Sequence, residues 1–400
     1  MKIKIRPSVL RGKVTAPPSK SMCHRLLICA GLSAGESLIS NVSYSEDILA
    51  TLDCLSAMGA KIEKGEGFVK ICGTLPKAGA FPCRESGSTL RFFIPLAMLC
   101  EGESRFICCG RLTERPMAIY ENIAKEKKLT YKKDSEVITV SGKLPSGDYT
   151  VPADVSSQFI SGLLFALPLC EGDSTLTLTG NIESRSYIDM TLSAMALFGV
   201  SAVWQNENTI YIKGNQQYKA GSLTVEGDCS NAAFLDAFNL FGGDVTTEGL
   251  REDTLQGDMI YKEYFSLLRQ GTPTLDIKNC PDLAPILMTV AAAKKGARLI
   301  NTARLKIKES DRGAVMAQEL SKFGAAVRVY NNEIVIDKAE LYTPKDDLYC
   351  HNDHRVVMSL AVLASAYGGT LEGAQAVSKS YPDFFDIVKS LGLETENYDG

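Results

Sequence analysis

One pattern recurs six times along the chain and limits what the chain can fold into. An apolar helix rich in small residues is followed by a glycine, a polar turn and a short β-branched strand. The copies are LLICAGLSAGESLIS (26–40), IPLAMLCEGESRFI (94–107), LLFALPLCEGDSTLTL (163–178), FLDAFNLFGGDVTTEG (234–249), ILMTVAAAKKGARLIN (286–301) and LAVLASAYGGTLEG (360–373). Self-similarity of this kind indicates a fold built from one repeated supersecondary unit.

A second pattern follows several of these copies. LSAMGAKIE (55–63), MALFGVSAVW (195–204) and LSKFGAAVRVY (320–330) each read as the end of a helix, a glycine C-cap and an alternating strand. The helices of the first pattern are apolar on nearly every side, which predicts that they are buried. Buried helices surrounded by strands make an α/β fold that reverses the usual layering of helices outside a sheet.

Six copies divide evenly into two lobes of three. The midpoint lies near VEGDCSNAA (225–233), where a strand ends and a helix begins. Two similar lobes would direct their helix N-termini toward a shared cleft, and helix N-termini attract anions. The repeat alone therefore predicts an anion site between two lobes that close over a ligand.

Charge and cysteine usage exclude several classes of function. The formal net charge of −4 lacks the basic excess of a nucleic-acid binder. Apolar runs fall short of the roughly 18 residues of a membrane span, and MKIKIRPSVLRG at the N-terminus has no apolar signal core, so we expect a cytoplasmic protein. Twelve cysteines without a C-x-x-C motif and only three histidines predict no metal site. Glycine motifs for ATP or NAD are missing as well, and we expect no cofactor.

Cations and hydroxyls precede nearly every apolar helix, where acids would complement the helix dipole. They lie in PPSKSMCHR (17–25), RESGSTLRFF (84–93), RLTERPM (111–117), DVSSQF (154–159), RLKIKESDR (304–312), HNDHR (351–355) and SKSYPDFF (378–385). Each could be a helix cap or solvated charge by itself. Together they predict a site for ligands that carry several negative charges, such as phosphates and carboxylates, with Arg91 adding charge to a phosphate cradle. Asp282 and Glu309 are the only carboxylates that this pattern places for proton transfer, although Asp282 could also cap a helix.

The motifs PSKSMCHR, SGSTLR, RLTERPM, SSQF, SRSYID, PDLAP, KIKESDR, NDHR and KSYPDFF follow one another in this order. From residue 20 to residue 385, the chain thereby resembles the 5-enolpyruvylshikimate-3-phosphate synthase family. The resemblance implies a two-domain inside-out α/β barrel with six βαβαββ repeats, three in each domain. It implies an N-terminal lobe over 21–226, a C-terminal lobe of 1–20 plus 227–400, and hinges near 18–20 and 225–229.

The resemblance also implies a reaction of the shikimate pathway, which leads to chorismate and the aromatic amino acids. The enolpyruvyl group of phosphoenolpyruvate would move to the 5-hydroxyl of shikimate 3-phosphate, with release of phosphate. The reaction would pass through a tetrahedral addition–elimination intermediate. We expect small-molecule substrates only, no nucleic acid or membrane partner, and a monomer.

Residue roles follow from the matching motifs. For catalysis the resemblance implies Asp282 as base, Glu309 as acid and Lys20 as an assisting group between the two ligands. It implies that shikimate 3-phosphate is bound by Lys20, by Ser21 and Arg25 at its carboxylate, by Ser156, Ser157 and Ser184 at its phosphate, by Gln158 and Tyr187 against its ring, and by Asp282 and Lys308 at its hydroxyls. It implies that phosphoenolpyruvate is bound by Lys20, Gln158, Arg312 and Arg355, and at its phosphate by Arg115, Lys379 and the Gly87 backbone.

Two positions depart from the family pattern, and two other functions stay open. Glu85 replaces an amide, and Arg304 stands where relatives are often uncharged. A UDP-N-acetylglucosamine enolpyruvyl transferase has the same fold and would need a mobile-loop cysteine, for which Cys108 and Cys109 lie in a plausible region. A non-catalytic binding protein on this fold would be expected to have lost a proton-transfer residue.

Overall fold

The computed structural model describes residues 1–398, which form two compact units. The N-terminal unit comprises Pro18–Glu226. The C-terminal unit comprises Met1–Pro17 together with the chain from Gly227 onward. The chain therefore passes between the units at Pro17–Pro18 and again at Glu226–Gly227.

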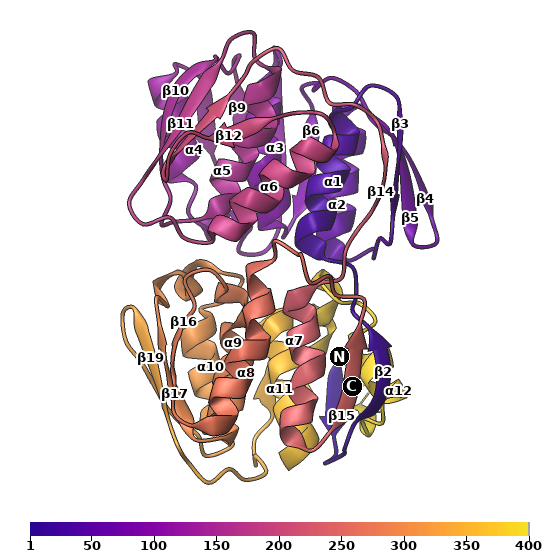
Figure 1. Cartoon of the computed structure of the whole chain (residues 1–400), viewed down its shortest axis with the longest axis vertical. Helices are drawn as coiled ribbons and strands as arrows, with labels where there is room; N and C mark the ends of the chain where they lie inside the picture. The colour runs from indigo at the N-terminus through magenta and orange to yellow at the C-terminus, as the bar shows by residue number, and fades with distance from the viewer. Residues whose placement is uncertain (399–400) are drawn as a thin grey trace. The chain divides into compact units, whose positions relative to one another are not determined.

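The N-terminal unit alternates helices with short strands (Figure 1). Its helices are α1 (Lys20–Leu32), α2 (Glu46–Met58), α3 (Gly87–Ala97), α4 (Ala118–Glu126), α5 (Ser157–Ala166) and α6 (Arg185–Leu197). Its strands are β3 (Glu36–Ser40), β4 (Lys61–Gly65), β5 (Phe68–Cys72), β6 (Ala80–Arg84), β7 (Glu103–Cys108), β8 (Thr130–Lys133), β9 (Val137–Ser141), β10 (Gly147–Pro152), β11 (Ser174–Thr179), β12 (Ala202–Trp204), β13 (Thr209–Ile212) and β14 (Ser222–Thr224).

The C-terminal unit repeats the alternation with strands from both chain ends. Its helices are α7 (Cys229–Ala237), α8 (Tyr261–Gln270), α9 (Ala284–Ala293), α10 (Arg312–Ser321), α11 (His354–Tyr367) and α12 (Phe384–Ser390). Its strands are β1 (Lys2–Ile5), β2 (Arg11–Thr15), β15 (Asp244–Glu248), β16 (Thr274–Asp276), β17 (Gly296–Ile300), β18 (Ala326–Val329), β19 (Glu333–Asp337), β20 (Leu348–Tyr349), β21 (Gly369–Glu372) and β22 (Thr395–Tyr398).

Within residues 1–398, each unit contains three sheets, and five of these six sheets share a common design. In the N-terminal unit the strand orders are β14-β3-β5-β4, β6-β7-β9-β8 and β10-β11-β13-β12. Each has a parallel first pair and ends in an antiparallel hairpin. In the C-terminal unit the orders are β16-β17-β19-β18, β20-β21-β1-β22 and the shorter parallel pair β15-β2.

The N-terminal strands complete sheets whose other members come from the second half of the chain. β1 lies between β21 and β22 and is antiparallel to both. β2 runs parallel to β15. The unit that contains the C-terminus is therefore incomplete without the first fifteen or so residues, because one of its sheets would lose a central strand.

Helices form the centre of each unit, as the apolar repeats predict. Residues 22–32 of α1 and residues 354–365 of α11 are buried along their whole length. In the N-terminal unit, β3, β4 and β5 flank the helices on one side and β10 and β11 on the other (Figure 1). The expected reversal of the usual α/β layering is confirmed.

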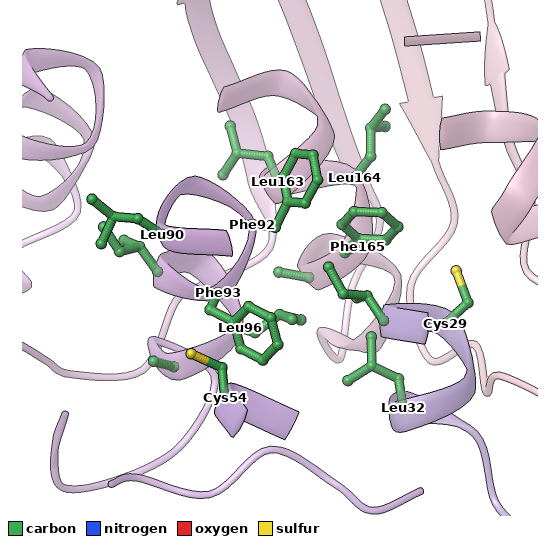
Figure 2. Close-up of a cluster of buried hydrophobic side chains, with 14 of the residues drawn as sticks. Cys29, Leu32, Cys54, Leu90, Phe92, Phe93, Leu96, Leu163, Leu164 and Phe165 are labelled. Atoms are coloured by element: carbon green, nitrogen blue, oxygen red, sulfur yellow. The ribbon is translucent and has the colours of Figure 1, made fainter. Parts of the chain in front are cut away.

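The centre of the N-terminal unit is an apolar cluster where α1, α2, α3 and α5 meet. Figure 2 shows Leu32 of α1, Phe92 and Phe93 of α3, and Phe165 of α5 directed into it. The rings of Phe92 and Phe165 pack edge to face with their centroids 5.5 Å apart. Cys54 of α2 lies in the same cluster. This packing fixes the helix axes and thereby the positions of the helix N-termini.

The predicted glycine C-caps are also confirmed. Gly59 after α2, Gly199 after α6 and Gly324 after α10 have φ of 108°, 74° and 91°. Glycine reaches this left-handed region without the steric penalty of a Cβ atom. Each glycine turns the chain from its helix into the following strand. In the part of the chain that the structure describes, the helices are too short or too polar to cross a membrane.

Candidate active site

Buried helices of the N-terminal unit begin at residues that the sequence predicts to bind ligands. α1 begins at Lys20, α3 at Gly87 and α5 at Ser157. Their first turns read KSMC, GSTL and SQFI, which are basic or uncharged. The preceding serines accept hydrogen bonds from first-turn backbone N–H groups. Each start therefore presents the positive end of a helix dipole, where an anion is favoured.

The Lys20 ammonium has a carboxylate partner that the sequence analysis missed. Its Nζ lies 2.7 Å from Asp47 Oδ2 in the first turn of α2, with both side chains about 15% exposed. That Asp282 and Glu309 are the only carboxylates placed for proton transfer stays a prediction, and Asp47 is a further carboxylate beside Lys20. The only sequence signal was an acid at a helix start, which ordinary capping also explains.

Arg25 is held in place by the protein itself and is 2% exposed. Its Nε donates to Thr191 Oγ1 at 2.8 Å, and its terminal nitrogens donate to the carbonyls of Ser21 and Tyr187 at 2.6 and 2.9 Å. The guanidinium also lies 5.8 Å from the centre of the Tyr187 ring. Burial lowers the pKa of Arg25 to about 10, so the side chain remains charged at neutral pH. The structure thereby brings Ser21, Arg25 and Tyr187 together.

Gly87 and Arg115 meet at the start of α3. A Cβ atom on Gly87 would lie 2.4 Å from an Arg115 terminal nitrogen. The guanidinium therefore rests against the first backbone unit of the helix. A positive charge beside a helix N-terminus is an arrangement suited to phosphate.

Gln158 is oriented at both ends of its amide. Arg91 donates to Gln158 Oε1 at 2.7 Å, and Gln158 Nε2 donates to Ser88 Oγ at 2.8 Å. Arg91 also donates to the Pro116 carbonyl at 3.2 Å and is 2% exposed. That Arg91 adds charge to a phosphate cradle stays a prediction, and these contacts give its side chain a second role. It orients Gln158.

The remaining predicted serines lie at helix starts. Ser156 caps α5 by accepting from the Gln158 backbone N–H at 3.3 Å. Ser157 is 6% exposed and Ser184 is 3% exposed. Ser184 precedes α6 in a left-handed conformation with φ of 57°, which is uncommon for serine. Backbone strain of this kind is often found at binding sites.

In the C-terminal unit, the Asp282 carboxylate is surrounded by cations. Arg312 donates to Oδ1 at 2.7 Å, Lys308 lies 3.2 Å from Oδ1, and Arg355 lies 3.2 Å from Oδ2. The side chain is 20% exposed. The N-cap position of α9 is Leu283, one residue later, and the Asp282 carboxylate contacts these charged groups. The capping explanation is therefore not needed for Asp282.

Arg312 is the centre of this cluster and is 1% exposed. Within the described chain, four of its N–H groups donate to carboxylates, those of Asp282, Glu309 and Asp353, at 2.7 to 3.2 Å. Burial alone would lower the pKa of Arg312, but these carboxylates raise it above its usual range. Arg312 is thus a fixed positive charge that sets the positions of both predicted proton-transfer residues.

Lys308 and Glu309 differ in their surroundings. Burial lowers the pKa of Lys308, and Asp282 opposes that shift. Glu309 accepts from Arg312 at 2.7 Å and is 23% exposed. A lysine with a lowered pKa gives up its proton more readily than an ordinary lysine, which matters for any proton transfer at Asp282.

Asp353 is a buried acid that contacts predicted site residues and that the sequence did not mark as one of them. It is fully buried and accepts from Arg312 Nε at 2.8 Å, from Ser310 Oγ at 3.0 Å and from the Arg355 backbone N–H at 3.0 Å. It caps α11. An aspartate just before an apolar helix was the available signal, and it suggests a cap without revealing the bond to Arg312.

Asp258 is a further buried acid near Asp282. It is 3% exposed and accepts a hydrogen bond from Ser230 Oγ. Burial, and then the negative charge of Asp282, raise the pKa of Asp258 to about 6, and Arg355 opposes this shift. Nothing in the sequence marks Asp258, because it lies in a short 3-10 helix far from the motifs.

Lys379 and Arg304 complete the predicted set. Lys379 Nζ donates to the Asn352 carbonyl at 2.9 Å, which places it beside the segment that leads to Arg355. Arg304 is 8% exposed and donates to the Lys278 carbonyl at 2.8 Å. Among residues 1–398, no group of three or more His, Cys, Asp and Glu side chains could hold a metal ion.

Comparison with known proteins identifies related sequences over nearly the whole chain. A family model described as EPSP synthase (3-phosphoshikimate 1-carboxyvinyltransferase) matches residues 5–388. The 3-phosphoshikimate 1-carboxyvinyltransferase of Clostridium kluyveri is 42% identical over 99% of this chain and 98% of its own length. That of Clostridioides difficile is 39% identical over 98% and 97%.

Solved structures share the fold. An EPSP synthase from Acinetobacter baumannii superposes with a TM-score of 0.80 at 22% identity, covering 99% of both chains. The enolpyruvyl transferase NikO from Streptomyces tendae gives a TM-score of 0.78 at 13% identity, covering 99% of this chain and 98% of its own. The expected fold class is confirmed.

Proposed function

The chain belongs to the EPSP synthase family, the 3-phosphoshikimate 1-carboxyvinyltransferases of the shikimate pathway, and from this premise we propose how its residues perform the reaction. Phosphoenolpyruvate donates the carboxyvinyl group, and the 5-hydroxyl of shikimate 3-phosphate accepts it. The products are 5-enolpyruvylshikimate 3-phosphate and inorganic phosphate. The observation that carries the assignment is the 42% identity over nearly the full length of a curated relative.

The N-terminal unit binds shikimate 3-phosphate in this proposal. Ser156, Ser157 and Ser184 hold the phosphate, supported by their places at the starts of α5 and α6. Arg25 and Ser21 hold the carboxylate. The fixed guanidinium of Arg25 supports this role, because a preordered charge loses little side-chain entropy on binding.

Residues of both units bind phosphoenolpyruvate. Gly87 and Arg115 take its phosphate in the N-terminal unit, which their close packing supports. Arg355 and Arg312 take its carboxylate in the C-terminal unit. Lys379 takes the phosphate as well. Arg312 already donates hydrogen bonds to protein carboxylates. Its positive charge therefore attracts the substrate carboxylate chiefly through long-range electrostatics.

The proton-transfer groups lie around Arg312. Glu309 gives a proton to the methylene carbon of phosphoenolpyruvate, which makes the neighbouring carbon electrophilic. Asp282 takes the proton of the 5-hydroxyl, and the new C–O bond forms a tetrahedral intermediate. Loss of a methyl proton and of phosphate then restores the double bond. The cations around Asp282 support its role as a base that is ionised before reaction.

Lys20 and Lys308 assist in this scheme. Lys20 pairs with Asp47 at 2.7 Å, which holds its ammonium at the start of α1. Lys308 contacts Asp282 and would also contact a ring hydroxyl. Both lysines supply positive charge where phosphate leaves or negative charge develops. Electrostatic stabilisation of this kind is the largest contribution to the rate enhancement of many enzymes.

The purified chain tests the assignment by phosphate release. We expect release only when phosphoenolpyruvate and shikimate 3-phosphate are both present. Replacing the acceptor by UDP-N-acetylglucosamine should abolish release. Release with the UDP sugar, or none with shikimate 3-phosphate, would contradict the proposal. The alternative acceptor is also disfavoured because the matching family model and the curated relatives are 3-phosphoshikimate 1-carboxyvinyltransferases.

A further inference from the structure

The buried face of α10 carries two charged side chains. Arg312 lies at the start of the helix and Glu319 follows seven residues later. Because seven residues make nearly two turns, both side chains lie on the same face. Glu319 has no exposed surface, so its carboxylate needs partners that compensate for lost hydration.

The partners of Glu319 lie around the segment that precedes α11. Its Oε2 accepts from the Tyr349 backbone N–H at 2.8 Å and from Lys322 Nζ at 2.7 Å. His351 Nε2 lies 3.3 Å from its Oε1. Lys322 also donates to the Asp347 carbonyl at 2.8 Å. A single carboxylate therefore joins α10 to residues 347–351.

That segment has an unfavourable backbone conformation. His351 and Asn352 are consecutive non-glycine residues with φ of 49° and 53°. Each left-handed residue costs on the order of 1–2 kcal/mol, less for asparagine, and such residues persist where surrounding contacts hold them. Glu319 contacts the ring of His351, and Lys379 donates to the carbonyl of Asn352.

The segment leads directly to the predicted phosphoenolpyruvate residues. Asp353 follows Asn352, bonds Arg312 and caps α11 through the Arg355 backbone N–H. Helix α10 thus holds residues 349–353 at two points, through Glu319 on one side and Arg312 on the other. Arg312, Arg355 and Lys379 all contact this one segment or belong to it.

We propose that Glu319 is a positioning residue for phosphoenolpyruvate binding. It fixes the left-handed turn at His351–Asn352 and thereby the places of Arg355 and of the carbonyl that orients Lys379. This inference rests on the proposed function, which assigns phosphoenolpyruvate binding to Arg355 and Lys379. Glu319 itself is fully buried and touches no substrate.

Steady-state kinetics of Glu319→Gln test the inference. The variant keeps the side-chain shape but removes the charge that holds Lys322, the Tyr349 N–H and His351. We expect the KM for phosphoenolpyruvate to rise about tenfold, whereas kcat and the KM for shikimate 3-phosphate change by less than about twofold. Equal increases in both KM values, or an unchanged KM for phosphoenolpyruvate, would overturn the inference.

His351→Asn is a milder second variant for the case that Glu319→Gln folds poorly. Asparagine tolerates the left-handed conformation, so the substitution removes the contact of the imidazole with Glu319 and its edge-to-face packing on Tyr349 without straining the backbone. We expect a rise of about threefold in the same KM, and a double variant no worse than Glu319→Gln alone, because both changes remove one interaction. Additive effects would contradict the proposed coupling. Glu333→Gln, which breaks the ion pair with Arg298 in the same unit, should leave both KM values unchanged.

Amide hydrogen exchange without substrates separates this inference from the proposed function. We expect residues 349–353 to exchange at least tenfold faster in Glu319→Gln than in the wild type. Inactive wild-type protein would defeat the proposed function. Unchanged exchange in this segment would defeat the role of Glu319, whether or not the enzyme turns over.

Discussion

Gly87 and Arg115 are packed so closely that a side chain larger than hydrogen at position 87 would clash with the guanidinium. A Cβ atom at Gly87 would lie 2.4 Å from one terminal nitrogen of Arg115 and 2.9 Å from its central carbon. Real Cβ contacts are practically never so short. The start of α3 and the guanidinium therefore form one preassembled surface.

Gly87→Ala should displace the Arg115 guanidinium while preserving the fold, because the end of a flexible side chain can move. We expect the KM for phosphoenolpyruvate to rise about tenfold or more, with an unchanged KM for shikimate 3-phosphate. Gly221→Ala is the matched control, since a Cβ there meets no atom within 4 Å. Similar kinetics for both alanine variants would contradict the role of this packing.

Asp282→Asn should abolish most turnover while leaving the fold intact. The amide keeps the shape of the carboxylate but cannot accept the substrate proton, so we expect kcat to fall by about 10²–10⁴. Stopped-flow phosphate release measures it. Asp311→Asn serves as the control because Asp311 caps α10 and asparagine caps equally well. A kcat within a few-fold of wild type would exclude Asp282 as the base.

Arg25→Lys should weaken both stability and acceptor binding. Lysine cannot reproduce the bonds to Thr191 and to the carbonyls of Ser21 and Tyr187, and we expect a loss of about 1–3 kcal/mol in the free energy of unfolding. The KM for shikimate 3-phosphate should rise with little change in that for phosphoenolpyruvate. Urea unfolding and kinetics measure the two effects. The exposed Arg105 of the same unit, replaced by lysine, should show neither.

Asp258 should make the protein less stable as the pH rises. Its pKa is raised from 3.8 to about 6 by burial and by Asp282, so between these values the folded state holds a proton that the unfolded chain has released. The contribution of Asp258 to the free energy of unfolding is therefore present near pH 4 and is lost by about pH 6 to 7. We expect Asp258→Asn to gain up to about 3 kcal/mol relative to wild type between pH 4 and pH 7.

Chemical unfolding at both pH values tests this sign. The exposed Asp346→Asn controls for the loss of one negative charge. A relative stability of Asp258→Asn that is the same at both pH values, or that falls toward pH 7, would contradict the raised pKa.

The fold was predictable because its main determinants are local and repeated. Composition and spacing predict the apolar helices, such as α1 and α11. They also predict the glycine C-caps at Gly59, Gly199 and Gly324. The pairing of β1 with β21 and β22 was not visible in the residues themselves. Short strands carry no signal for a partner hundreds of positions away, and the location of the N-terminus in the second lobe came from the family resemblance.

The sequence predicts candidate site residues but not the contacts that these residues make within the protein. Lys20 and Arg312 are cations at helix starts, and Arg91 is a cation one turn into its helix. Only the tertiary structure shows that Arg91 binds Gln158, that Arg312 binds Asp353, and that Lys20 binds Asp47. These partners lie on other elements, and a pattern read along one helix contains no information about the helix packed against it.

The placement of β1 and β2 affects the order in which the chain can fold during its synthesis. Residues 18–226 contain everything that the N-terminal unit needs, so this unit can fold while the rest is still being made. β2 cannot pair until β15, which begins at Asp244, has been synthesised. At 5–20 residues/s, the synthesis of the chain between these two strands takes roughly 10 to 50 s. β1 waits until β22 has left the ribosome. Until their partner strands are synthesised, β1 and β2 have unpaired edges. We therefore expect a chaperone to bind this N-terminal segment during synthesis.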